Sequence, residues 1–205
     1  GSDALRYNFT GGSNTASGYR SMFSNTTGVA NTASGRNSLY NNISGGSNVA
    51  TGYNTLYNNI TGSGNSAYGA SSLYYNTSGS ANTAVGQEAL LANTTASYNT
   101  AVGNLSLNQN VTGAKNTAMG YQSLFYNDTT DNNTAVGYQS LYGNTGGYYN
   151  TAAGSWSLKD NTTGIENTAV GFAAIQTNTT GSANTAVGST ALRFINSGGA
   201  NTAIG

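Results

Sequence analysis

The sequence predicts an all-β fold: a parallel β-roll or β-solenoid of about twelve 17-residue rungs, with two short strands in each rung. The motif Asn-Thr-Ala-x-Gly recurs along the whole chain at a constant interval of 17 residues, without insertions. A fixed period of this length indicates one supersecondary unit stacked on itself. Glycine recurs twice in most repeats, and each glycine costs a helix about 1 kcal/mol relative to alanine, which argues against helices. The motif begins at Asn14, Asn31, Asn48, Asn65, Asn82, Asn99, Asn116, Asn133, Asn150, Asn167, Asn184 and Asn201.

This periodicity predicts a single repeat domain over residues 1–205. Residues 1–13 match the end of a preceding repeat, residues 14–200 form eleven full repeats, and residues 201–205 open a twelfth. We expect Gly1-Ser2 to be a cloning remnant and the chain to be a fragment of a longer protein.

The first predicted strand of each rung lies in the motif itself, whose Asn we number position one. Positions one, three and five are Asn, Ala and Gly in every copy, as in Asn133, Ala135 and Gly137. A position that admits only Ala has room for one methyl group, so it should face a tight interior. The Gly column should mark a positive φ or a close approach of two backbones. We expect the Asn side chains to form a ladder, each amide donating to one neighbour and accepting from the other.

The second predicted strand surrounds position nine, which is apolar in every copy and is represented by Leu141. We interpret this position as the second core column. Position twelve is Asn in all but the last repeat, as in Asn144, and position fifteen is usually Gly. Asn and Gly are common turn residues, so this segment predicts the second turn of the rung.

The predicted strand leaves an apolar column outside the coil. Side chains at positions two and four point away from Ala at position three. Position four is often aliphatic, as in Val85, Val102, Met119 and Val136. An outward-facing apolar column needs another chain to pack against. Three chains around a common axis are the natural arrangement for a fibre. We therefore expect a homotrimer.

Composition excludes several functions. Charged residues make up 6% of the chain, the net charge is zero, and His and Cys are absent. Zero net charge lacks the electrostatic signature of a nucleic-acid-binding protein, and no run of 18 apolar residues is present that could span a membrane. Without His and Cys, the usual zinc and copper ligands and the Ser-His or Cys-His pairs are missing. We expect no nucleic-acid partner, no membrane insertion by this segment, no cofactor and no enzymatic activity.

Asn-Thr-Ala-Val-Gly followed by a small residue, Leu and Asn-Thr-Thr-Gly resembles the head repeats of trimeric autotransporter adhesins. The segment 133–141 (Asn-Thr-Ala-Val-Gly-Tyr-Gln-Ser-Leu) is also similar to repeats of phage tail-fibre-like proteins and of mosaic adhesive trimer fibres. The resemblance covers the chain from about residue 3. It implies a left-handed parallel β-roll that trimerises. The 17-residue period differs from the usual autotransporter spacing.

Two aromatic columns are candidate binding residues. Position ten carries Phe23, Tyr40, Tyr57, Tyr74, Phe125 and Tyr142, and position six carries Tyr19, Tyr53, Tyr121, Tyr138 and Phe172. The lone tryptophan, Trp156, is at position seven. These rings could stack on sugars or on a target surface. Alternatively, they could lie along a subunit seam or shield the turn. We favour this alternative because aromatic residues are enriched in interfaces.

Two further sequence patterns bear on function. Asp128 and Asp131 share one turn and could contribute to a Ca²⁺ site, but Ca²⁺ needs about six to eight oxygen ligands, so a solvated turn is favoured. The Thr column at position two could order water as an ice-binding surface does. Val49 and Ser66 interrupt this column, and the residues at position four vary from Ser17 to Tyr68.

The sequence thus predicts a structural or adhesive fibre segment, either the head or the shaft of a bacterial surface adhesin or phage-type tail fibre. We expect an extracellular location on a bacterial surface or a virion, with a cell-surface glycan or protein as receptor. An ice-binding β-solenoid that uses the Thr column is the alternative.

Overall fold

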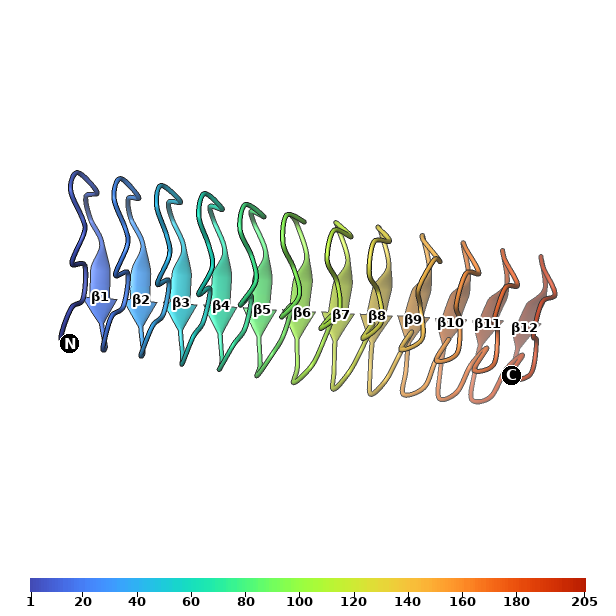
Figure 1. Ribbon diagram of the computed structural model, residues 1–205. Helices are drawn as coiled ribbons and strands as arrows, with labels where there is room; N and C mark the ends of the chain where they lie inside the picture. The colour runs from blue at the N-terminus through green and yellow to red at the C-terminus, as the bar shows by residue number, and fades with distance from the viewer. The chain divides into compact units, whose positions relative to one another are not determined.

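The computed structural model describes residues 1–205 as an all-β chain of short parallel strands with no helix (Figure 1). The chain divides into two compact units, Gly1–Val102 and Gly103–Gly205. Each unit holds six strands. The first unit contains β1 (Thr15–Ser17), β2 (Thr32–Ser34), β3 (Val49–Thr51), β4 (Ser66–Tyr68), β5 (Thr83–Val85) and β6 (Thr100–Val102). The second contains β7 (Thr117–Met119), β8 (Thr134–Val136), β9 (Thr151–Ala153), β10 (Thr168–Val170), β11 (Thr185–Val187) and β12 (Thr202–Ile204).

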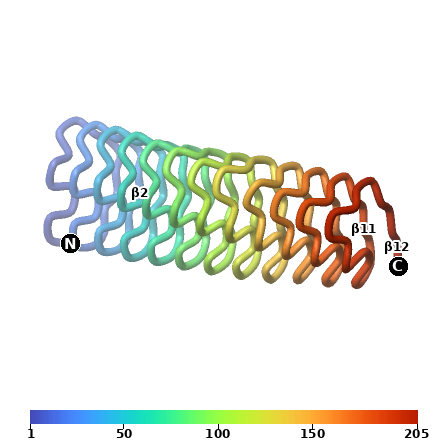
Figure 2. The backbone as a smooth tube through the Cα atoms, turned by 45° about the vertical axis from the view of Figure 1, so that its right-hand side comes forward, coloured from blue at the N-terminus to red at the C-terminus, as the bar shows by residue number.

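Within each unit, successive strands pair in parallel and in register, so each unit is a β-solenoid. Thr134 is opposite Thr151, and Ala135 is opposite Ala152, one repeat further along the chain. The amide of Thr134 donates to the carbonyl oxygen of Asn150 at 2.8 Å. Because every repeat has the same length, each coil reproduces the outline of the previous one within its unit (Figure 2).

The inner face of the strand is the Ala column, as expected. Ala135 is fully buried, while its neighbours Thr134 and Val136 remain partly or largely exposed. The strand ends at Val136 and is followed by Gly137, which has a φ of +131°. A Cβ atom on Gly137 would lie 2.6 Å from the carbonyl oxygen of Gly154, so this glycine is required both for its backbone conformation and for the close approach of two rungs.

The predicted second strand is wrong, because each rung has one strand, and positions six to eleven form a turn segment. Gln139 and Leu141 have φ values of +49° and +50°. Ser140 and Leu141 are consecutive and both fully buried, which the side-chain alternation of a regular strand would not allow. The segment is still hydrogen-bonded between rungs, since the amide of Leu141 donates to the Ser157 carbonyl oxygen at 2.9 Å. Leu141 is nevertheless a core residue, as its column predicted.

The continuous amide ladder runs along position twelve, where the sequence indicated only a turn. Asn144 Nδ2 donates to Asn127 Oδ1 at 3.0 Å and to the Gly147 carbonyl oxygen at 2.8 Å. In turn, Asn161 Nδ2 donates to Asn144 Oδ1 at 3.0 Å. These contacts satisfy fully buried amides from rung to rung.

The Asn side chains at position one mainly bond to backbone groups rather than to one another. Asn133 Nδ2 donates to the Gly147 carbonyl oxygen at 2.9 Å, and Asn133 Oδ1 accepts the backbone N–H of Asn150 at 3.0 Å. The side-chain amide of Asn150 also approaches Asn133 Oδ1, at 3.3 Å. The expected amide-to-amide ladder at position one is therefore secondary to bonds that fasten the strand to the adjacent turns.

Candidate binding surfaces

The outer strand face of the second unit is uncharged and rich in apolar side chains. Its centre is formed by the position-four residues, which we call the aliphatic strip: Met119, Val136, Ala153, Val170, Val187 and Ile204. Met119 and Val136 are 43% and 39% exposed, and they are register partners in neighbouring strands. The exposed rings of Tyr121, Tyr138 and Phe172 lie at position six, just beyond the strand ends. The outward orientation predicted for position four is thus confirmed.

The threonines at position two share this outer face. In the second unit this column is uninterrupted from Thr117 to Thr202, and its members are register partners along β7–β12. In the first unit, Val49 and Ser66 stand in the same column.

The aromatic candidates of the first unit stack on one another. Phe23, Tyr40, Tyr57 and Tyr74 form what we call the ring ladder, with centroid separations of 5.1, 5.0 and 5.2 Å and interplanar angles of 7°, 4° and 9°. Because rings in adjacent rungs are stacked, the faces of the inner members, Tyr40 and Tyr57, are covered by their neighbours. Burial raises the pKa of Tyr57, and the neighbouring hydroxyls of Tyr40 and Tyr74 raise it further.

The aromatic candidates of the second unit form two groups. Phe125 and Tyr142 stack at 5.5 Å and 20°, and Tyr126 packs edge-on against both rings. Burial raises the pKa of Tyr142, with a further contribution from its hydrogen bond to Tyr126. These rings therefore contact each other rather than standing apart.

Trp156 has aromatic neighbours that its sequence position did not indicate. Its ring lies 5.4 Å from that of Phe172 and 6.2 Å from that of Tyr138, and its Nε1 donates to Gln139 Oε1 at 3.3 Å. The structure joins Trp156 to the position-six aromatics, whereas the sequence placed it alone at position seven.

Asp131 has a defined structural contact. Its Oδ1 accepts the backbone N–H of Ala114 at 2.6 Å. Ser63 does the same at the equivalent position, where its Oγ accepts the N–H of Gly46 at 3.0 Å. The chain contains no group of three or more His, Cys, Asp or Glu side chains placed to hold a metal ion. The bond to Ala114 gives Asp131 a role in joining two successive rungs.

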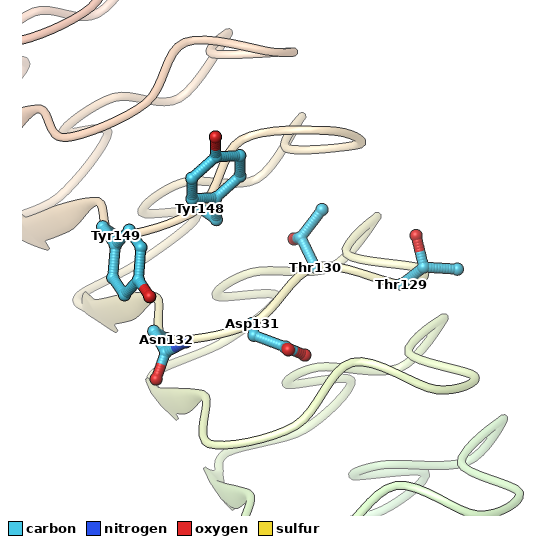
Figure 3. Close-up of a pocket in the computed structure, with 6 residues that line it drawn as sticks. All are labelled: Thr129, Thr130, Asp131, Asn132, Tyr148 and Tyr149. Carbon is cyan, nitrogen blue, oxygen red and sulfur yellow. The ribbon is translucent and has the colours of Figure 1, made fainter.

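One cavity in the second unit was not anticipated from the sequence. It has a volume of about 260 Å³ and is lined by Thr129, Thr130, Asp131, Asn132, Tyr148 and Tyr149 (Figure 3). The cavity lies where the residues depart from the repeat columns, so the recurring pattern does not indicate it. The adjacent Tyr-Tyr pair at positions sixteen and seventeen was the available signal.

Comparisons with known proteins give no relative. No protein-family model matches the chain, and neither a curated protein nor a solved structure matches it. None of the chain forms a helix long and apolar enough to cross a membrane.

Proposed function

We propose that this chain is a structural and adhesive fibre segment that assembles as a homotrimer. The observation that carries the proposal is the aliphatic strip, which remains exposed along the outer strand face of the second unit. Soluble monomers rarely expose large contiguous apolar patches, and such patches mark interaction sites.

The charge distribution supports burial of this face between copies of the chain. In the second unit, positions one to six contain no charged residue. Burying the face would therefore leave no unpaired charge, which is the costly event in interface formation. Parallel chains in register would place the same position-four residue of each chain at the same rung, for example Val136 against Val136.

The proposed task is mechanical: a stiff element that carries or forms a receptor-binding surface, with no catalytic step. The receptor would be a cell-surface glycan or protein, and the setting an extracellular one, on a bacterial surface or virion. A left-handed coil, as in the adhesin heads that the sequence resembles, forms part of the same proposal.

Light scattering on a sizing column tests the assembly. We expect a mass near three times the 20.8 kDa of one chain. The double variant Val136→Lys, Val170→Lys should shift the mass to that of one chain, because it places charges in the seam. Thr163→Lys, at an exposed turn position, is the matched control and should stay trimeric. A wild-type mass of one chain would refute the trimer.

A second candidate function is ice binding by the uninterrupted Thr column of β7–β12. This function needs the outer strand face to be free, so it competes directly with the trimer. Thermal hysteresis in the wild-type chain that is lost in Thr134→Lys would favour it. Absence of thermal hysteresis in a trimeric sample would rule out ice binding.

A further inference from the structure

We propose that the cavity between residues 129–132 and the Tyr148–Tyr149 pair is a binding site for a single neutral pyranose sugar. This inference rests on the proposed function: if the chain forms an adhesive surface, a neutral sugar is the class of ligand that this cavity would bind. The site lies wholly within the second unit and consists of residues from two successive rungs.

The tyrosine pair departs from the repeat without a structural need. Positions sixteen and seventeen hold Ser182 and Ala183 in another rung of the same unit, and small residues recur at both positions in other rungs. Tyr149 has a φ of +58°, close to the +57° of Ala183, so this turn residue adopts the same φ with or without an aromatic side chain. The rings therefore add a surface feature to a turn that folds without them.

The two rings form a corner with accessible faces. Their centroids lie 5.4 Å apart with an interplanar angle of 75°, and the residues are 42% and 57% exposed. The same positions hold Asp131 and Asn132 in the preceding rung and Ile165 and Glu166 in the following rung, so no aromatic ladder covers these rings. The face of an aromatic ring is electronegative and attracts the slightly positive C–H groups on the apolar side of a pyranose.

The opposite wall supplies hydrogen-bonding groups suited to sugar hydroxyls. Asp131 accepts the Ala114 N–H of the preceding rung, so its carboxylate lies at the rim of the cavity and points away from the tyrosines (Figure 3). The side-chain amide of Asn132 can both donate and accept, and Thr129 adds an exposed hydroxyl. Figure 3 shows Thr130 and Asp131 on the rung next to the one that carries the tyrosines.

The volume and charge of the cavity restrict the kinds of ligand that fit it. A cavity of about 260 Å³ is smaller than the roughly 300–1,000 Å³ of pockets for drug-sized ligands, so it suits one sugar ring. Asp131 is the sole charged lining residue, and a carboxylate repels acidic sugars. A neutral hexopyranose fits the polar wall, the aromatic corner and the charge.

The test is a ligand-observed NMR titration of the full chain with the methyl pyranosides of glucose, galactose, mannose and N-acetylglucosamine, and with N-acetylneuraminic acid as the acidic probe. We expect at least one neutral glycoside to bind with a dissociation constant of about 1 mM, and the acidic sugar to bind at least about tenfold more weakly.

Three variants locate the binding. Tyr148→Ser with Tyr149→Ala recreates the Ser182–Ala183 turn and should weaken binding at least about tenfold. Asp131→Ser should narrow the gap between neutral and acidic sugars, because serine can still accept from Ala114, as Ser182 accepts from Ile165 at 3.1 Å, but carries no charge. Tyr98→Ala, which removes an exposed tyrosine at the same repeat position elsewhere, is the control and should leave binding unchanged.

Failure of all neutral glycosides to bind, undiminished binding in the double tyrosine variant, or tighter binding of the acidic sugar would overturn the proposal. The mass of the same sample separates this outcome from the assembly. A trimer that binds no sugar refutes the pocket alone, whereas a monomer that binds sugar refutes the trimer alone.

Discussion

At the scale of single residues, the interior of this protein is set by the smallest side chains. Ala135 and Ser140 are fully buried, and Gly137 brings two backbones into close contact. Leu141 is the large apolar residue of its rung, and it is held at a positive φ that costs a non-glycine residue roughly 1–2 kcal/mol. The core is thin, so each position tolerates little change in volume.

Replacing Ala135 with Leu should lower the free energy of unfolding by roughly 1–3 kcal/mol per chain, because the added carbons have no space between rungs. Urea denaturation measures this loss. The matched control, Ala183→Leu, adds the same atoms at an exposed turn and should be close to neutral. Equal stability of the two variants would mean that Ala135 does not face the interior.

At the scale of the rung elements, stability depends on ladders that connect like residues. The amide ladder at position twelve ends where Ile195 replaces Asn. An Asn side chain at position 195 would donate to Asn178 Oδ1, which is buried and has no hydrogen-bond partner. The end of the ladder therefore carries a penalty that a single substitution can remove.

Ile195→Asn should stabilise the chain by about 1 kcal/mol, because its Nδ2 could donate to Asn178 Oδ1 as the preceding rungs do. The thermal midpoint is the readout. Ile165→Asn, on the surface turn of another rung, should give no gain. A lower midpoint for Ile195→Asn would show that the apolar contacts of Ile195 outweigh the missing hydrogen bond.

The ring ladder predicts a sensitivity to alkali. Burial and the adjacent tyrosines raise the pKa of Tyr57 above its ordinary value of 10.0. A group whose pKa is higher in the folded state contributes stability that is complete below its unfolded pKa and is lost as pH rises through the folded pKa. Stability should therefore fall above about pH 10, and Tyr57→Phe should reduce that fall. Tyr98→Phe, at an exposed ring, should not change the profile of unfolding midpoint against pH.

At the scale of the whole molecule, the repeat makes stability a sum of rung terms and nearest-neighbour terms. Within a unit, every rung pairs with its neighbours through the same backbone and side-chain bonds. Removal of one complete repeat therefore leaves the junction between the remaining rungs in register.

Deleting residues 167–183, one full repeat, should lower the thermal midpoint less than deleting only residues 168–172. The short deletion removes β10 and shifts every later column out of register. Far-UV circular dichroism during heating compares the two proteins. If the five-residue deletion proved milder, the rungs would not be the units of stability.

The sequence predicted the 17-residue repeat unit, the parallel stacking of rungs and the burial of the Ala and Leu columns. A strict period makes this possible because it reveals the positions that accept only one type of side chain. The sequence did not predict the turn geometry around Leu141, since a positive φ for leucine opposes local preference and is imposed by bonds to neighbouring rungs. Asn144 looked like a turn residue because its ladder partners are a full repeat away. The Tyr148–Tyr149 cavity was missed because it depends on residues that break the repeat.

The ring ladder also makes the first unit an optical probe of its own integrity. The rings of Tyr40, Tyr57 and Tyr74 are nearly parallel, with centroid separations of 5.0 and 5.2 Å between successive rungs. Electronic transitions of chromophores held in such fixed, close alignment couple to one another. The near-ultraviolet circular dichroism of this chain should therefore carry an excitonic signature that disappears when neighbouring coils separate, even while each ring keeps its local environment. Loosening of the stack could thus be followed by light alone, without an attached label.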